Sequence, residues 1–119
     1  MRILDVEPVR SAEAPGLTAH LVAGEVVHAA FVSPTGSILF TERRILLVQR
    51  EHLLEEKVET SSWPYREVKH FSIQEGSGGG GRAALKIWLG AEPQPLHLRA
   101  GPDAGLEALQ RLLAERISR

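Results

Sequence analysis

The chain of 119 residues contains no cysteine, a single methionine and few aromatic residues. Without cysteine it can form no disulfide, no cysteine-ligated zinc site and no thiol nucleophile. Lysine and arginine number 14 against 15 aspartate and glutamate, and no block of one sign occurs. Because nucleic-acid binding and charge-driven membrane binding both need a cationic surface, the composition disfavours both kinds of partner.

Long apolar segments are also missing. No stretch reaches the roughly 18 consecutive apolar residues that cross a bilayer. The first ten residues lack the apolar core of a signal peptide. We therefore expect a cytoplasmic protein. The length suits one domain, and the 43% of hydrophobic residues suffice for a core.

Residues 1–24 are expected to be an N-terminal segment, followed by one domain over residues 25–119. Residues 1–13 mix polar residues with Ile3, Val6 and Val9, which fits either a tail or an extra strand. Pro15 and Gly24 bracket a short apolar stretch. Proline opens helices and glycine closes them, so this stretch predicts one or two helical turns.

From Glu25 to Ala100 the apolar residues recur with a period of two, which is typical of β-strands. Short strands separated by turns are predicted near residues 25–31, 38–40, 45–48, 57–62, 68–75, 83–89 and 96–98. The segment 45–48 is apolar throughout, as in a strand that is buried on both faces. The segment 57–62 is polar and is predicted to be an edge strand that ends at Pro64.

The last segment has a helical period instead. Leu106, Leu109, Leu113 and Ile117 recur at spacings of three and four, and Asp103 stands before them as an N-cap. A helix with one apolar face must bury that face against another element. The predicted fold is therefore mainly β: a seven-stranded, partly open barrel, made of two orthogonal antiparallel sheets and capped by a C-terminal amphipathic helix.

Several short segments resemble the bacterial pleckstrin-homology domain family. Residues 38–46 read ILFTERRIL and resemble the family's IxFTdxRLI signature. Residues 57–59, 64–72 and 85–88 resemble its later blocks, in the family's order. The resemblance implies a pleckstrin-homology-like barrel and a tendency to form homo-oligomers, with a cellular role that is largely undefined. The sequence departs from the family at the hairpin 49–56 and at the glycine loop 76–81.

An oligomer interface is predicted at four residues: Trp88, Lys86, Leu46 and Val48. Leu85, Ile87 and Leu89 share one face of their strand, so Lys86 and Trp88 lie on the other, and exposed tryptophan is favoured at protein interfaces. The run 45–48 has more apolar surface than one barrel interior needs, and a second subunit would cover it. Two alternatives stay open for Trp88: a bulge that turns it inward, or cover by the helix or the N-terminal segment.

No catalytic, cofactor-binding or metal-ligating residue is predicted. The glycines of 76–81 match a dinucleotide-binding spacing, but a strand follows where that motif needs a helix N-terminus. The five histidines show no metal-ligand spacing. Glu55 and Glu56 would diverge on a strand, and the serines at 61–62 lack the glycines of a nucleophile elbow. The turn 33–36 has no lysine or arginine to hold a phosphoinositide.

These observations predict a non-enzymatic interaction module that self-associates into a homo-oligomer or binds another protein, without a cofactor. The alternative is a peripheral membrane or lipid-binding module, which rests on the fold alone. A small-molecule enzyme is a third hypothesis, and no cluster of polar residues in the sequence supports it.

Overall fold

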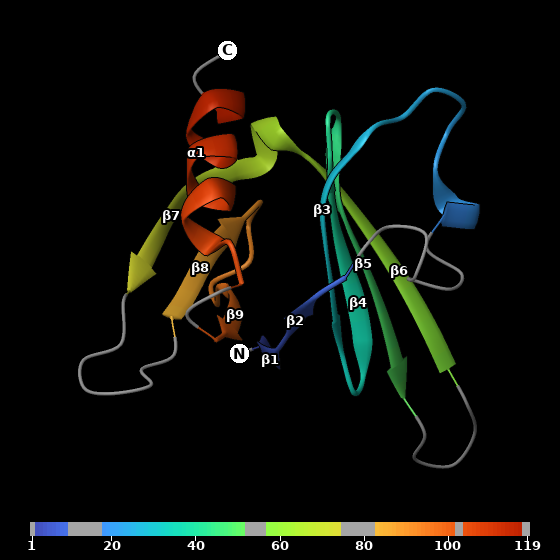
Figure 1. Ribbon diagram of the computed structural model, residues 1–119, viewed down its shortest axis with the longest axis horizontal. Coiled ribbons are helices and arrows are strands. Elements are labelled where there is room, and N and C mark those ends of the chain that lie inside the picture. Colours follow the sequence, from blue (N-terminus) through green and yellow to red (C-terminus); the bar gives the residue numbers. More distant parts are fainter. Residues whose placement is uncertain (1, 10–17, 52–56, 75–82, 102–103, 118–119) are drawn as a thin grey trace. The chain divides into compact units, whose positions relative to one another are not determined.

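The computed structural model describes residues 2–9, 18–51, 57–74, 83–101 and 104–117. The chain divides into two compact units, Met1–Glu7 with Tyr65–Arg119 (unit 1) and Pro8–Pro64 (unit 2). The described residues form nine strands, two 3-10 turns and one α-helix (Figure 1).

The five-stranded sheet has the order β2-β3-β4-β5-β6, and it contains most of the described residues of unit 2. Its strands are β2 (Glu7–Pro8), β3 (Val27–Ser33), β4 (Gly36–Thr41), β5 (Arg44–Glu51) and β6 (Lys57–Pro64). β3, β4, β5 and β6 pair antiparallel in chain order. The 3-10 turn η2 (Thr18–His20) precedes them.

The β3–β4 hairpin closes through a two-residue turn, Pro34 and Thr35, between the paired residues Ser33 and Gly36. A Cβ atom at position 36 would collide with the backbone carbonyl oxygen of Val48 on β5. Glycine is therefore required for the close approach of these strands.

One face of this sheet carries fully buried side chains. β4 and β5 pair Ile38 with Leu47 and Phe40 with Ile45, and all four side chains are fully buried. Phe31 packs edge-on against Phe40, with ring centroids 6.2 Å apart and planes at 88°. This is a favourable aromatic geometry, and it fixes β3 against β4.

The four-stranded sheet of unit 1 has the order β1-β9-β8-β7. Its strands are β1 (Arg2–Asp5), β7 (Val68–Gln74), β8 (Ala83–Leu89) and β9 (Leu96–Ala100). β7, β8 and β9 pair antiparallel, whereas β1 joins the edge of β9 in parallel. The 3-10 turn η3 (Tyr65–Glu67) leads into β7.

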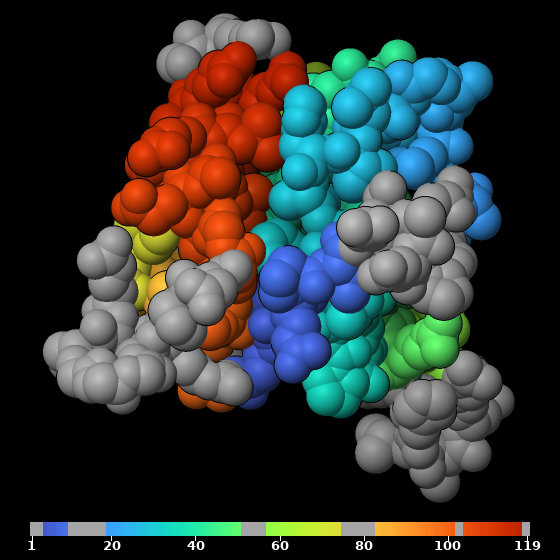
Figure 2. Space-filling model, in the orientation of Figure 1, coloured from blue at the N-terminus to red at the C-terminus, as the bar shows by residue number. Residues whose placement is uncertain are grey.

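The helix α1 (Leu106–Ile117) packs on β7, β8 and η3 within unit 1 (Figure 1). Leu106, Leu109 and Leu113 are buried, so the leucine stripe has the role that its spacing predicts. The opposite side of α1 forms part of the surface (Figure 2) and carries an ion pair between Glu107 and Arg111.

The mainly β fold with two sheets and a C-terminal helix is confirmed. All seven predicted strands are present as β3 to β9, and 45–48 is buried on both faces. Two expectations were wrong in detail. Ile117 is 36% exposed because it lies at the last helical residue, and the parallel strand β1 makes its sheet mixed rather than antiparallel.

Three predicted features lie outside the described residues, wholly or in part: the Asp103 cap, the loop 76–81 and the end of the hairpin 49–56. In the described residues of the N-terminal segment, 2–5 and 7–8 form strands, and a 3-10 turn at 18–20 precedes Gly24. Gly24 has a φ of 79°, a conformation that favours glycine.

Candidate functional site

The strand β8 directs alternate side chains to the two faces of its sheet. Leu85 and Ile87 are fully buried on the face that packs in unit 1, and Leu89 is 2% exposed there. Lys86 and Trp88 point to the opposite face and are partly exposed. The predicted alternation of β8 is therefore correct.

Trp88 stacks on His70 of the neighbouring strand β7. The two ring centroids lie 4.0 Å apart and the planes differ by 17°. β7 shifts its register between Val68 and His70, so Val68 stays buried while His70 is exposed and pairs with Trp88. The bulge lies in β7, before His70, and does not turn Trp88 inward. Trp88 therefore stays on the outer face of β8.

His97 on β9 lies directly opposite Lys86. Both of its ring nitrogens are buried, and neither has a hydrogen-bond partner among the described residues. Loss of water lowers the pKa of His97, and the nearby charges of Lys86 and Arg99 lower it further, whereas Asp5 opposes them. Arg99 is held by Asp5 through Nε–Oδ1 and Nη2–Oδ2 bonds of 3.0 and 2.9 Å.

We call the surface formed by His70, Lys86, Trp88 and His97 the Trp88 face. It combines a stacked aromatic pair with one lysine, and Ser72 of β7 lies opposite that lysine on the same face. Such a surface suits recognition through packing and cation contacts. Among the described residues, no three histidine, aspartate or glutamate side chains come together to hold a metal ion.

Leu46 and Val48, the other two residues of the predicted interface, are 1% and 9% exposed. They pack with Ala30 and Leu39 on the second face of the five-stranded sheet, where three partly buried residues of the same unit cover them: Val9, Leu21 and Val27. Part of the cover that we expected from a second subunit therefore comes from residues of unit 2. Lys86 and Trp88 remain to carry the predicted oligomer contact.

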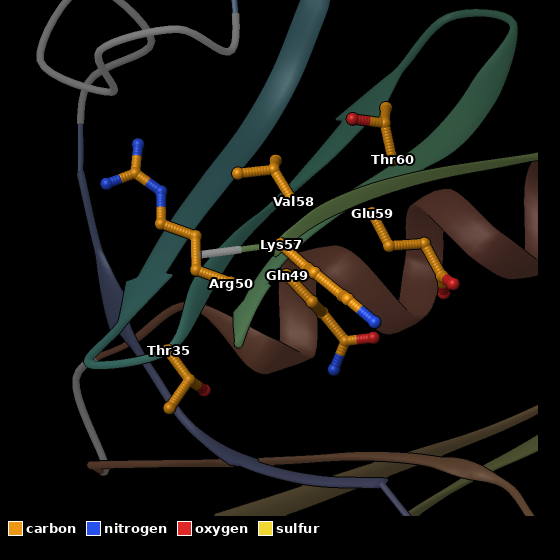
Figure 3. Close-up of a pocket in the computed structure, with 7 residues that line it drawn as sticks. All are labelled: Thr35, Gln49, Arg50, Lys57, Val58, Glu59 and Thr60. Carbon is orange, nitrogen blue, oxygen red and sulfur yellow. The ribbon is translucent and has the colours of Figure 1, made fainter. Parts of the chain in front are cut away.

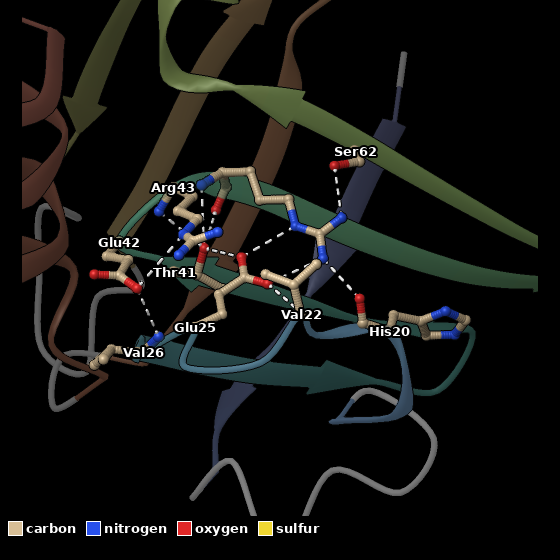
Figure 4. A network of polar contacts seen from close by, with 9 residues as sticks. His20, Val22, Glu25, Val26, Thr41, Glu42, Arg43 and Ser62 are labelled. Atoms are coloured by element: carbon tan, nitrogen blue, oxygen red, sulfur yellow. Dashed lines mark hydrogen bonds and ion pairs between the residues drawn. The ribbon is translucent and has the colours of Figure 1, made fainter.

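A buried carboxylate organises the start of β3 in unit 2 (Figure 4). The Glu25 side chain has no exposed surface, and it accepts hydrogen bonds from Nε and Nη2 of Arg44 at 3.1 and 3.0 Å. The Thr41 hydroxyl donates to it at 2.6 Å, and the Val22 amide at 3.1 Å. The bonds from Arg44, followed by that from Thr41, lower the pKa of Glu25 to about 2 although burial opposes this.

Arg44 extends this network to other segments of the same unit. Its Nη2 donates to the carbonyl oxygen of His20 at 2.7 Å, and its Nη1 donates to the Ser62 hydroxyl at 3.1 Å (Figure 4). The guanidinium thereby ties η2, the β4–β5 turn and β6 together. Because the Glu25 carboxylate and the Arg44 guanidinium are both hydrogen-bonded to several partners, this network is a structural clamp.

A hollow of about 760 Å³ lies where β5 ends and β6 begins (Figure 3). Its lining comprises Thr35, Gln49, Arg50 and residues 57–60. β5 and β6 pair Arg50 with Val58 and Gln49 with Glu59, so Arg50 and Lys57 point to opposite faces of the sheet. The two cations of this hollow therefore do not converge on one anion.

Sequence reasoning missed Glu25 and His70 as organising residues. Glu25 finds Arg44 only after β3, β4 and β5 have paired, and the one signal in the sequence was a carboxylate just before the first strand. His70 is one of the five histidines that show no metal-ligand spacing, and its stack with Trp88 forms only when β7 pairs with β8. Neither contact has a local sequence signature.

The chain matches the sequence model of the family described as bacterial PH domain, over residues 5–117. It is also 33% identical over 95 residues to Uncharacterized protein YjqA of Bacillus subtilis. The aligned residues cover 79% of this chain and 76% of that protein. In the described residues, no helix is long and apolar enough to cross a membrane.

Solved structures with a pleckstrin-homology domain share the fold. One from Shewanella loihica has a TM-score of 0.78 at 22% identity, covering 95% of this chain and 97% of the other. One from Shewanella amazonensis has a TM-score of 0.68 at 22% identity, with 87% and 93% coverage. A third, from Exiguobacterium sibiricum, has a TM-score of 0.73 at 15% identity, with 98% and 63% coverage.

Proposed function

Because the chain belongs to the bacterial PH domain family, we propose that it is a non-enzymatic, cytoplasmic interaction module that self-associates through the Trp88 face. The observation that carries the proposal is the partly exposed Trp88, stacked on His70 at 4.0 Å and flanked by Lys86. Tryptophan is enriched among the residues that dominate protein–protein binding energy.

The stack on His70 supports this role for a physical reason. A side chain that is already held in one rotamer loses less conformational freedom when a partner packs on it. The neighbouring Lys86 can pair with a carboxylate of a second subunit, and it adds specificity more than affinity. The Trp88 face thus has a rigid aromatic anchor beside a charged rim.

The test is the native mass of the purified chain, measured by size exclusion with light scattering. We expect a mass above that of one chain for the unaltered protein and for Trp88→Phe, and a lower mass for Trp88→Glu. Ala108→Glu, at an exposed position of α1, adds the same charge elsewhere and should assemble normally. The mass of a monomer for the unaltered chain at high concentration would reject the proposal.

A further inference from the structure

Two basic side chains of the Trp88 face lie directly opposite each other and have no partner among the described residues. Both ring nitrogens of His97 are buried, and neither makes a hydrogen bond. Lys86, its neighbour on β8, makes no ion pair and no side-chain hydrogen bond within the described part of the chain. A buried polar group without a partner costs free energy, so an acceptor that reaches both groups would be bound favourably.

The charges around His97 leave a positive excess on this face. The described charged groups near the ring are Lys86 on β8, Arg99 on β9 itself and Asp5 on β1. Arg99 holds Asp5 through both carboxylate oxygens, at 3.0 and 2.9 Å, so these two charges compensate each other. The charge of Lys86 remains, and it favours an anionic group at this place.

The pairing of β8 with β9 allows one carboxylate to contact both side chains. Residues directly opposite in an antiparallel sheet have Cβ atoms about 4.5–5.5 Å apart, and Lys86 and His97 are paired in this way. The His97 side chain is only partly buried, so rotation about its side-chain bonds can bring a ring nitrogen to the surface. A protonated ring donates from both nitrogens, which a carboxylate beside Lys86 would stabilise.

We propose that a carboxylate of a second subunit binds between Lys86 and His97, and that His97 takes up a proton from the solvent when it does so. This inference rests on self-association through the Trp88 face, and it names the group that the second subunit contributes. In the separate chain, burial and the charges of Lys86 and Arg99 lower the pKa of His97, so the ring is neutral. The carboxylate raises this pKa again, and association therefore strengthens as the pH falls.

Sedimentation equilibrium at pH 7.5 and pH 5.5 measures this coupling. We expect the association constant of the unaltered chain to be about tenfold larger at pH 5.5. Uptake of one proton per contact limits the gain to about tenfold per pH unit. Exposed carboxylates stay ionised at both values. The Glu25 clamp is intact at both, because its contribution declines only below pH 4.5.

Variants identify the group that takes up the proton. His97→Leu should associate with nearly equal strength at the two pH values. His70→Phe, which keeps a ring against Trp88, should retain the pH dependence. His20→Gln, at an exposed histidine of unit 2, should retain it as well. Lys86→Met should weaken association at both pH values. A general effect of the net charge, which crosses zero near pH 6.5, would persist in His97→Leu.

Nuclear magnetic resonance of the ring protons measures the coupling from the other side. The pKa of His97 should be higher in concentrated protein, where the chain is associated, than in dilute protein, where it is not. Trp88→Glu should remove this dependence on concentration. A histidine with a purely structural role would titrate alike at both concentrations.

The outcomes separate this inference from the function on which it rests. Association that requires Trp88 but has the same strength at both pH values overturns the inference and leaves self-association standing. A pKa of His97 that falls on association, a pH dependence that survives in His97→Leu, or loss of association in His97→Leu at pH 7.5 overturns it too. Identical behaviour of the unaltered chain and Trp88→Glu rejects self-association through the Trp88 face, and this inference with it.

Discussion

Glu25 and His97 are both ionisable groups withdrawn from water, one in each unit, and the pKa of each is lowered for opposite reasons. At Glu25, hydrogen bonds from Arg44 and Thr41 stabilise the charged form against the cost of burial. At His97, burial without a partner for either ring nitrogen penalises the charged form. The first group is therefore fixed as an ion, and the second as a neutral ring.

This difference separates a structural clamp from a surface whose charge depends on pH. The clamp joins η2, the β4–β5 turn and β6 through one guanidinium, so its loss should destabilise unit 2 as a whole. His97 borders Lys86 on the Trp88 face, so its protonation adds a second positive charge there. Three changes test this difference between Glu25 and His97.

The largest effect is expected from Arg44→Met, which leaves the Glu25 carboxylate buried without its cation. Breaking a buried ion pair costs about 3–5 kcal/mol, and the remaining bonds from Thr41 and Val22 place this case near the lower end. Chemical denaturation at neutral pH measures the loss. The matched control is Arg43→Met, because Arg43 is 58% exposed and only approaches Glu42 at 3.7 Å. It should change the free energy of unfolding by less than about 0.5 kcal/mol.

The pH dependence of stability should show the Glu25 clamp directly. Its pKa of about 2 in the folded state lies below the ordinary value of 4.5, so the unfolded state takes up the proton first. The contribution is complete above pH 4.5 and disappears as the pH falls from there towards 2. It amounts to no more than about 3 kcal/mol. Glu25→Gln should abolish this acid-dependent part, and an unchanged pH profile would contradict the clamp.

The smallest effect is expected from His97→Leu. The pKa of His97 in the folded state is lowered below 6.5, so the unfolded state takes up the proton first. The free energy of unfolding is therefore higher above pH 6.5, and it falls as the pH drops from 6.5 through the folded-state pKa. Leucine removes two unpartnered nitrogens, so we expect a gain of about 1 kcal/mol at pH 5.5 and a smaller gain at pH 8. His20→Gln, at an exposed histidine, is the control. Equal gains at both pH values would mean that protonation of His97 does not contribute to the pH dependence of the free energy of unfolding.

The sequence was sufficient for features that depend on local periodicity. The apolar run 45–48 predicted a strand buried on both faces, and the spacing of Leu106, Leu109 and Leu113 predicted the helix that covers β7 and β8. Alternation in 85–89 also placed Lys86 and Trp88 on one face. In each case neighbouring residues decide the outcome.

Features that depend on distant residues were not predictable in this way. Glu25 and Arg44 are 19 positions apart, and their contact needs three strands in register. The cover of Leu46 and Val48 comes in part from Val9 and Leu21, which lie in the chain between β2 and β3, so we assigned that surface to a second subunit. The parallel pairing of β1 with β9 joins the first and the last of the described strands, which no local pattern encodes.

Sedimentation equilibrium of the unaltered chain and of Trp88→Glu, over a range of concentrations, tests the central claim most directly. If the Trp88 face joins copies of this protein, the unaltered chain associates reversibly and the variant sediments as a single 13.0 kDa species. Identical association of the two proteins, or no association of either, would contradict the claim.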